Sequence, residues 1–310
     1  MHSHLVLAFL NYNTTPELLQ ALAALPAALA NMPARVIVID NASRDNPATL
    51  VQQKFPHVEW LQNNTNLGFA AAFNQLFARV PADWYLLLNS DIILPPASVP
   101  ALLSYAQQYP NLGLAGVALV REDGSPQASY APFPSLATEL LNRSLYRHIH
   151  RRKAPHTTPF EVDTIVGAVM LVPRHTIERT GGFDPRFYFF MEETDWCRRI
   201  RNAGLHVFHF PQIRVTHLQG RAANQTPLRA RIEFHRSRLL YFSLHHGRTA
   251  AAILCAGTVL RVLLNALTHV LLVLLTLGLI RKVRTKCVTY LGLLSWYLRG
   301  CPRSWGLAPQ

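Results

Sequence analysis

Two carboxylates that follow apolar runs are the first residues of this chain whose placement suits chemistry. Asp91 comes shortly after the run Tyr85–Leu88, and Asp40 comes directly after the run Val36–Ile39. In open α/β sheets, ligands bind outside the carboxyl ends of the strands, so two such residues can face one crevice. Asp40 can accept a hydrogen bond from a base N–H or a ribose hydroxyl, and Asp91 can hold a hard cation on a diphosphate. The pattern favours a nucleotide site, although both residues can also simply cap the helices that follow.

The segments around these carboxylates alternate between strand and helix patterns. Strands are predicted at residues 5–10, 35–40, 58–62 and 85–91, and helices at 14–30 and 69–80. A further helix and an apolar strand lie between residues 100 and 120. Such alternation implies an α/β fold with a mainly parallel central sheet and right-handed crossovers. Neither a Gly-x-Gly-x-x-Gly motif after a strand nor a Gly-x-x-x-x-Gly-Lys-Ser/Thr motif occurs, so a dinucleotide site and a P-loop lose support.

A second group of candidate residues lies between positions 162 and 217. Glu192, Glu193 and Asp195 open a predicted helix that ends near residues 202–204. Three acids in a first turn can simply complement the helix dipole. Glu192, however, has aromatic neighbours in sequence, and desolvation there would raise the pKa of its carboxyl group towards the range of a general base. His217 ends a predicted strand over residues 213–217 and is a candidate metal ligand.

Composition indicates a globular body with an appendage. The chain has 310 residues, half of them hydrophobic, and can bury a sizeable core. The four cysteines, at positions 197, 255, 287 and 301, form no C-x-x-C pair, so a disulfide framework and a zinc knuckle are not indicated. The first apolar run is short and lacks a basic flank, which favours a first strand over a secretory signal. We therefore expect the body to stay in the cytosol.

Charge separates the body from the tail. No Asp or Glu follows Glu233, whereas ten Lys and Arg do, which gives the tail +10 of the net charge of +13. We expect a catalytic domain at residues 1–247 and a basic, apolar helical tail at 248–310. The basic residues of the tail flank leucine-rich stretches, which indicates an anionic membrane surface as partner and no nucleic acid.

The tail holds one stretch that is long enough to cross a bilayer. Residues 262–280 are nineteen nearly apolar positions, which at 1.5 Å per residue just span a hydrocarbon core of roughly 30 Å. Both flanks are basic, so the positive-inside rule gives no orientation. A membrane-seated helix or re-entrant hairpin is favoured over a full span, and packing on the body as a core helix is the third alternative. Residues 130–160, rich in Pro, His and Arg, are interpreted as a solvated loop, or as a lid over an anionic substrate if they become ordered on binding.

With these residues assigned, the chain resembles the inverting glycosyltransferases of family 2, which have the GT-A fold, and within them the bacterial rhamnosyltransferase-like branch. The resemblance covers roughly residues 4–245 and rests on an ordered set of motifs: Val38-Ile39-Asp40-Asn41-Ala42-Ser43, Asn64-Thr65-Asn66-Leu67-Gly68-Phe69, Leu87-Leu88-Asn89-Ser90-Asp91, Gly167-Ala168, Gly182-Phe183-Asp184, Glu192-Glu193-Thr194-Asp195, Arg199 and His217.

The resemblance implies a role for each matching residue. The residues implied in donor binding are Asp40, Asn41, Asn66, Gly68, Asn89 and Asp91. Asp91, Asn89 and His217 are implied as ligands of Mg²⁺ or Mn²⁺. Glu193, or its neighbour Glu192, is implied as the base that deprotonates the acceptor hydroxyl, and the acceptor-facing or helix-orienting residues are Gly167, Ala168, Asp195 and Arg199. Two departures from the family pattern stand out: Asn89 replaces the first Asp of the Asp-x-Asp metal motif, and Glu193 replaces the usual Asp.

The expected activity is transfer of rhamnose or a similar hexose, with inversion, from a nucleoside-diphosphate sugar to a glycan or lipid-linked acceptor in cell-surface polysaccharide synthesis. The expected location is the cytoplasmic face of the inner membrane, with peripheral or single-helix attachment. One alternative is a sugar-phosphate nucleotidyltransferase, but the loop Asn11–Thr14 lacks the Gly, Arg and Lys that such an enzyme needs after its first strand. The other is a non-catalytic membrane-binding or nucleic-acid-binding protein, which leaves the acidic strand ends unexplained.

Overall fold

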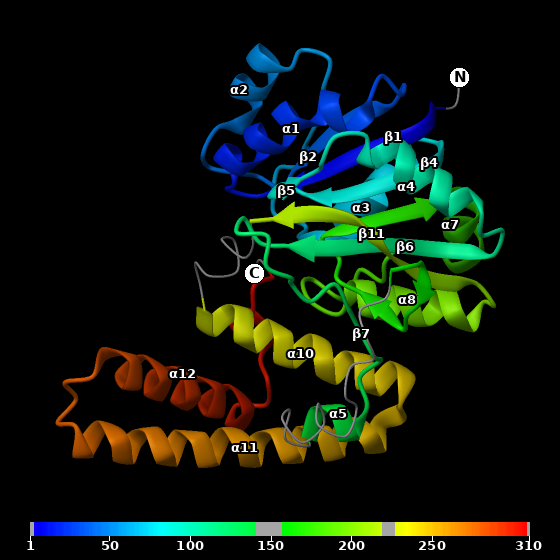
Figure 1. Ribbon diagram of the computed structural model, residues 1–310. Helices are drawn as coiled ribbons and strands as arrows, with labels where there is room; N and C mark the ends of the chain where they lie inside the picture. Colours follow the sequence, from blue (N-terminus) through cyan, green and yellow to red (C-terminus); the bar gives the residue numbers. More distant parts are fainter. Residues whose placement is uncertain (1–2, 141–156, 219–226, 309–310) are drawn as a thin grey trace. The chain divides into compact units, whose positions relative to one another are not determined.

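The computed structural model describes residues 3–140, 157–218 and 227–308 (Figure 1). Contacts divide the chain into two compact units. The sheet unit contains the described residues 3–133, 157–186 and 192–218, and the helical unit contains 134–140, 187–191 and 227–308. The expected domain boundary at 247/248 stays a prediction. In the structure, the helix Pro227–His245, which precedes that boundary, belongs to the same unit as the two helices of the tail.

The sheet unit is built on a nine-stranded mixed sheet with the order β3-β2-β1-β4-β10-β6-β11-β5, and β8 pairs with β11. The first four strands are parallel, as the alternating pattern predicted. β10 then runs antiparallel to both β4 and β6, and β6 pairs with β11 in parallel. The strands of this sheet are β1 (Ser3–Asn11), β2 (Arg35–Asp40), β3 (Glu59–Gln62), β4 (Ala82–Asn89), β5 (Ile92–Ile93), β6 (Leu112–Val120), β8 (Phe160–Glu161), β10 (Val169–Pro173) and β11 (His206–His217). A small second sheet pairs β7 (Tyr130–Ala131) with β9 (Thr164–Ile165).

Helices cover both faces of this sheet. The large core on one face joins residues of α1 and α4 to alternate residues of the strands, among them Leu86 and Leu88 of β4. Side chains alternate between the two faces along a strand, so Tyr85, one residue before Leu86, faces the other side of the sheet. There the centroid of its ring lies 5.1 Å from that of Phe77 of α3. The helices of the sheet unit are α1 (Thr15–Leu29), α2 (Pro47–Lys54), α3 (Gly68–Arg79), α4 (Ser98–Gln107), α7 (Arg174–Thr180) and α8 (Glu192–Asn202).

The helical unit is made of three long helices and short segments. Its core contains Ile232, Val262, Leu293 and Trp296, which join α10, α11 and α12. A second cluster packs Phe187 against Tyr241, Phe242 and Leu254. The helices of this unit are α5 (Leu136–Leu140), α10 (Pro227–His245), α11 (Gly247–Leu275), α12 (Arg281–Leu298) and the 3-10 turn Arg303–Trp305.

The expected α/β class is confirmed, with three local differences from the sequence interpretation. The strand expected at 213–217 is the end of a longer strand, β11, whose register against β6 shifts between Phe210 and Arg214. α2 was not foreseen, because its mixed sequence has no clear apolar period. Of the loop expected at 130–160, residues 141–156 lie outside the described residues, and residues 136–140 form α5.

Candidate active site

Asp40, at the end of β2, is buried, and its carboxylate is held by the protein on both oxygens. Oδ1 accepts hydrogen bonds from Asn11 Nδ2 at 2.8 Å and Ser43 Oγ at 2.6 Å. Oδ2 accepts from the Ser43 backbone N–H and from Gln62 Nε2, both at 2.9 Å. Four such bonds match the roughly four lone-pair positions of a carboxylate, so Asp40 shapes the loop after β2. Its expected contact with a nucleoside stays a prediction.

The other expected donor-binding residues near Asp40 also organise backbone. Asn41 is buried, donates to the Gly68 carbonyl at 3.0 Å and accepts from Asn63 Nδ2 at 2.8 Å. Asn66 Oδ1 accepts from the Gly68 backbone N–H at 2.9 Å. Gly68 has a φ of 78°, in the left-handed region that glycine enters at least cost. The loop between β3 and α3 is thus set by the residues that the sequence motif had marked.

A chain of hydrogen bonds connects Asp40 to the end of β4. Asn11 bonds Asp40 with its amide nitrogen and accepts from Thr14 Oγ1 with its oxygen at 2.9 Å. Thr14 Oγ1 lies 2.6 Å from Ser90 Oγ, which directly precedes Asp91. The ends of β2, β1 and β4 are therefore fixed relative to one another.

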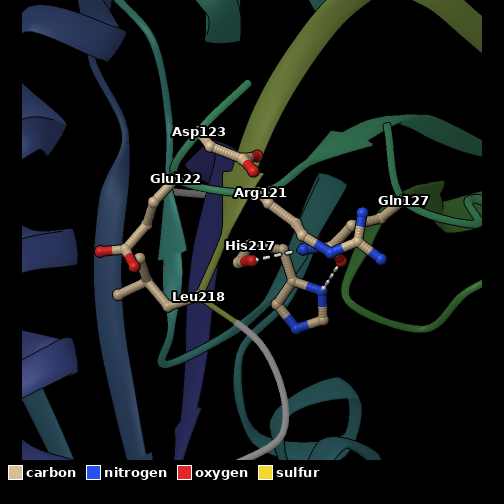
Figure 2. Close-up of a pocket in the computed structure, with 6 residues that line it drawn as sticks. All are labelled: Arg121, Glu122, Asp123, Gln127, His217 and Leu218. Atoms are coloured by element: carbon tan, nitrogen blue, oxygen red, sulfur yellow. Dashed lines mark hydrogen bonds between the residues drawn. The ribbon is translucent and has the colours of Figure 1, made fainter. Parts of the chain in front are cut away.

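Asp91 and His217 meet beyond the strand ends. Asp91 Oδ1 lies 3.5 Å from His217 Nε2, and both side chains are mostly buried. The pairing of β5 with β11 sets this approach, because His217 is opposite Ile92 and the Leu218 N–H donates to the Asp91 carbonyl. Figure 2 shows His217 at a cavity of about 340 Å³. The residues lining this cavity are Arg121, Glu122, Asp123, Gln127, His217 and Leu218.

The chemistry of these donors fits a divalent cation that is shared with a ligand. Across the described ranges, no three His, Cys, Asp or Glu side chains come together as a metal cluster. Asp91 and His217 supply one oxygen and one nitrogen, and Asn89, two residues before Asp91, carries an amide oxygen. Mg²⁺ and similar ions complete such partial ligand sets with water and substrate phosphates. The donor set therefore suits a metal–diphosphate complex better than an all-protein metal cage.

The turn at Gly167 and Ala168 connects the strand-end residues to Glu193. The Asn89 backbone N–H donates to the Ala168 carbonyl at 3.0 Å. On its other side, the Gly167 backbone N–H donates to the Glu193 carboxylate. A Cβ atom added to Gly167 would lie 3.5 Å from Cγ of Glu193, so the Glu193 side chain lies directly beside this glycine. The Gly167–Ala168 turn thus connects Asn89, at the end of β4, to Glu193, in the first turn of α8.

The surroundings of Glu193 shift the pKa of its carboxyl group. Burial raises the pKa of its carboxyl group above the ordinary value of 4.5, although hydrogen bonds from the backbone N–H groups of Glu193, Thr194 and Gly167 act in the opposite direction. A raised pKa brings a carboxylate closer to the basicity that proton abstraction at neutral pH requires. Glu192 is more deeply buried, with 4% of its surface exposed, whereas Glu193 is half-buried. The assignment of the base to Glu193 stays a prediction that this geometry supports.

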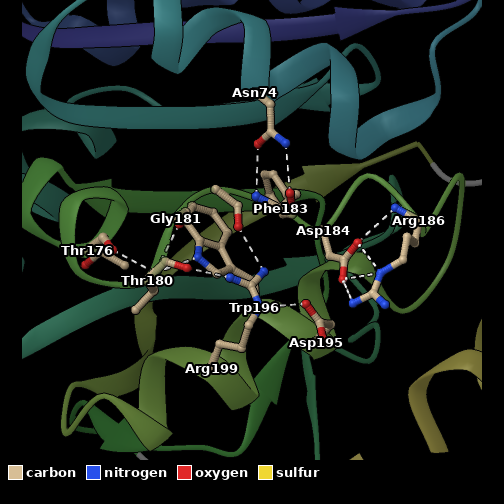
Figure 3. Close-up of polar contacts among 11 residues, drawn as sticks. Asn74, Thr176, Thr180, Gly181, Phe183, Asp184, Arg186, Asp195, Trp196 and Arg199 are labelled. Carbon is tan, nitrogen blue, oxygen red and sulfur yellow. Dashed lines mark hydrogen bonds and ion pairs between the residues drawn. The ribbon is translucent and has the colours of Figure 1, made fainter. Parts of the chain in front are cut away.

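Arg199 fastens α8 to the preceding loop (Figure 3). Its Nε donates to Asp195 at 2.8 Å, and its two terminal nitrogens donate to the carbonyls of Thr180 and Gly182 at 2.7 and 2.9 Å. The same loop is held from α3, where the Asn74 amide bonds both the N–H and the carbonyl of Phe183. All three guanidinium nitrogens face protein acceptors, which supports the helix-orienting role expected for Arg199 and Asp195.

The structure brings most of the expected residues together and adds residues that were not foreseen. Asp40, Asn41, Asn66 and Gly68 form one group at β2 and β3; Asn89, Asp91, His217, Gly167, Ala168 and Glu193 form the second, joined to the first by Asn11, Thr14 and Ser90. Asn11 could have been found, because it ends the first apolar run as Asp40 and Asp91 end theirs. Gln127, which contacts His217, carries no such signal.

The fold defines a class of protein: a GT-A glycosyltransferase fold, with a central sheet flanked by helices. A solved structure with this likeness is a mannosyltransferase from Pyrobaculum calidifontis in complex with GDP-Man and Mn²⁺. It matches with a TM-score of 0.57 and 16% identity, over 96% of this chain and 87% of that one.

The family follows from sequence. Residues 6–169 match the model of Glycosyl transferase family 2, and the chain belongs to this family. Residues 147–220 also match the model described as N-terminal domain of galactosyltransferase.

Two curated relatives are rhamnosyltransferases. The N-acetylglucosaminyl-diphospho-decaprenol L-rhamnosyltransferase of Mycobacterium tuberculosis is 27% identical over 255 residues, which cover 76% of this chain and 83% of the relative. Rhamnosyltransferase WbbL of Escherichia coli is 24% identical over 160 residues, which cover 50% of this chain and 59% of the relative. The expected resemblance is confirmed, and the chain is a glycosyltransferase of polysaccharide synthesis.

Proposed function

We propose that this glycosyltransferase moves a rhamnosyl or similar hexosyl residue, with inversion, from a nucleoside-diphosphate sugar to a lipid-linked glycan acceptor. The observations that carry the proposal are the approach of Asp91 to His217 and the connection of Asn89, two residues before Asp91, to Glu193 through the Gly167–Ala168 turn. They support a cation-binding pair and a carboxylate base that belong to one site. The name of the mycobacterial relative supports the choice of sugar and of a diphospholipid acceptor.

In the proposed reaction, Glu193 takes the proton from the acceptor hydroxyl as that oxygen attacks the anomeric carbon. The bond between the anomeric carbon and the donor diphosphate breaks on the opposite face, so the configuration inverts. Gly167 and Ala168 keep the base in position relative to Asn89. Asp40 and Asn41 act indirectly, by fixing the loops that face the nucleoside.

Asp91, His217 and Asn89 are the residues that would hold a divalent cation. Mg²⁺ or Mn²⁺ bound there would neutralise negative charge on the departing nucleoside diphosphate. The Mn²⁺ in the mannosyltransferase complex supports this assignment.

The helical unit is proposed to attach the enzyme to the cytoplasmic face of the inner membrane. Among the described residues, one helix, α11, is long and apolar enough to cross a membrane by length and composition. The exposed large apolar side chains of α11 are Ile253, Leu260, Leu263, Leu264, Leu267, Leu271, Leu272, Leu274 and Leu275. At 100° per residue they fall within one half of the helix circumference, about 180°, and all except Leu263 and Leu272 fall within about 100°. Leu254, Thr258, Val262 and Ala266 lie on the opposite side and are buried in the helical unit.

The charged contacts of α11 favour a helix that lies in the plane of the leaflet over one that spans it. Arg261, at the middle of α11, donates to the carbonyls of Glu139 and Leu140. Arg238 bonds both Glu139, at 2.9 Å, and Thr258 of α11, at 2.8 Å. In a spanning helix, Arg261 would lie near the bilayer centre, where a charged residue costs about 2.5–3.5 kcal/mol even by insertion scales.

The segment after α11 carries exposed leucines, and the start of α12 carries a cluster of basic residues. Leu277 and Leu279 are 84% and 82% exposed, and the following residues Arg281, Lys282, Arg284 and Lys286 are exposed cations. Juxtamembrane Lys and Arg are attracted to anionic head groups by about 1 kcal/mol each. An apolar face bordered by cations is typical of in-plane attachment to an anionic leaflet.

The test is a transfer assay with purified full-length protein, a panel of nucleoside-diphosphate sugars and N-acetylglucosaminyl-diphospho-polyprenol in anionic vesicles. We expect metal-dependent formation of a rhamnosylated lipid from one donor, with Glu193→Gln as the inactive control. A product that retains the donor's anomeric configuration would refute the mechanism. Transfer of a nucleotidyl group to a sugar phosphate would favour the nucleotidyltransferase alternative.

A further inference from the structure

Gln127 holds His217 by two of its groups at once (Figure 2). Its Nε2 donates to the backbone carbonyl of His217 at 2.7 Å, and its Oε1 lies 3.1 Å from Nδ1 of the His217 ring. A carbonyl oxygen can only accept, so the amide nitrogen must be the atom that faces it. This contact fixes which way the Gln127 amide points, a choice that is otherwise made from the hydrogen-bond network. The amide oxygen therefore faces the ring, and Nδ1 must carry the hydrogen between them.

The consequence concerns the other ring nitrogen. A neutral imidazole has one N–H and one nitrogen with a free lone pair. With the hydrogen on Nδ1, the lone pair is on Nε2, the atom that lies 3.5 Å from Oδ1 of Asp91. The Nε2 lone pair of His217 and the carboxylate oxygen of Asp91 then lie close together as two acceptors, an arrangement that suits a bound cation. If Nδ1 lost its acceptor, the ring could carry its hydrogen on Nε2 or turn away from Asp91.

The chain places Gln127 by folding back along β6. The Gln127 backbone N–H donates to the Leu119 carbonyl at 2.8 Å, and Val120 makes a bridge with Pro126. β6 is also the parallel neighbour of β11, which ends at His217. The strand end that carries the histidine and the turn that carries the glutamine are thus fixed by the same strand.

We propose that Gln127 is a positioning residue that sets the tautomer and the orientation of His217 for a divalent cation shared with Asp91. The inference rests on the proposed metal site and assigns a role to a residue outside the matched motifs. Hydrogen-bond partners of metal-binding histidines commonly change metal affinity by about 10–100-fold when they are replaced. We expect an effect of that size here, with little change in folding, because Gln127 is half-buried and lies outside the helices and strands.

The experiment measures Mn²⁺ binding to the full-length protein by electron paramagnetic resonance of free Mn²⁺, with a nucleoside diphosphate present, without turnover, and relative to the nucleotide alone. Gln127→Leu removes both side-chain hydrogen bonds at similar volume and should weaken Mn²⁺ binding by about 10–100-fold. Gln127→Glu keeps an acceptor for Nδ1–H and should stay within about threefold of the unaltered protein, because a carboxylate partner also supports a metal-binding histidine. Gln108→Leu makes the same change at an exposed glutamine that only bonds the Ser104 carbonyl, and is the matched control.

The outcomes separate this inference from the metal assignment itself. His217→Ala should weaken Mn²⁺ binding at least as much as Gln127→Leu does, and thermal unfolding midpoints should agree among the Gln127 and Gln108 variants. If His217→Ala weakens binding while Gln127→Leu binds as the unaltered protein does, the positioning role is refuted and the metal site stands. If the unaltered protein shows no saturable Mn²⁺ binding, or His217→Ala has no effect, the metal site is refuted, and the role of Gln127 with it.

Discussion

Removal of the Arg199 side chain should destabilise the sheet unit far more than removal of another arginine on the same helix. Asp195, the ionic partner of Arg199, has only 2% of its side chain exposed, and Arg199 has 27%. Arg199→Ala would leave that carboxylate buried without its cation, a change that typically costs about 3–5 kcal/mol. It also removes the donors to the carbonyls of Thr180 and Gly182. For units of about 150–250 residues, a loss of 3–5 kcal/mol lowers the unfolding midpoint by roughly 6–20 °C.

Arg201→Ala is the matched control. Arg201 lies on α8 as well and pairs with Asp163, but the two side chains are 37% and 38% exposed. Exposed pairs of this kind contribute at most about 1 kcal/mol. Arg199→Lys keeps the charge but cannot reach all three acceptors, and should fall between the two alanine variants.

The assay is thermal unfolding followed by tryptophan fluorescence, because the Trp196 indole is bonded to Thr180 in the same loop. Parallel activity measurements should show a lower kcat for Arg199→Lys with unchanged donor binding, since the helix that carries Glu193 is less firmly held. Equal unfolding midpoints for Arg199→Ala and Arg201→Ala would refute the reasoning.

The remaining predictions concern the base, the metal and the membrane. Glu193→Gln should lower kcat by roughly 10²–10⁴-fold with donor binding intact, whereas Glu192→Gln should cost less; full activity in Glu193→Gln with loss in Glu192→Gln would reverse the assignment. Because Glu193 must be ionised to accept a proton and burial raises its pKa, activity should fall as the pH falls through a value above 4.5, and a kcat/KM profile that stays flat to below that pH would contradict this. Asp91→Ala should abolish transfer and Asp91→Asn should be nearly as poor, while undiminished turnover in excess chelator would contradict a metal requirement. Leu267→Asn combined with Leu271→Asn should reduce flotation with anionic vesicles at unchanged secondary structure, and equal flotation of the variant and the unaltered protein would argue against the lipid-facing assignment of α11.

The parts of the sheet unit that could be predicted from sequence are those where an apolar run, which marks a buried strand, is followed by a polar residue. Asp40 and Asp91 follow apolar runs because the strands before them, β2 and β4, are buried in the sheet. The reversal of β10 could not be predicted in this way. All five of its residues are buried, and an apolar run buried on both faces reads the same in either direction.

The supporting residues of the site were harder to foresee than the residues they support. Thr14, Ser43 and Gln127 act through contacts with residues that are 30 or more positions away in most cases, such as Ser43 with Asn13 and Gln127 with His217. Their side chains are common in turns for local reasons, so their presence there carries no information about the site. Only the return of the chain along β6 gives Gln127 its partner.

The start of α8 is also the covalent link between the two units. Residues 187–191 fold with the helical unit, where Phe187 is buried against Tyr241 and Phe242, whereas Glu192 begins α8 in the sheet unit. The last two residues of that segment, Phe190 and Met191, have φ values of 70° and 69°, a conformation that costs roughly 1–2 kcal/mol per residue for residues other than glycine. These two residues therefore lie in the peptide link between the unit proposed to bind lipid and the helix that carries Glu192 and Glu193. By reciprocity, if lipid contact changes the affinity of the site for acceptor by some factor, acceptor binding changes the affinity for lipid by the same factor.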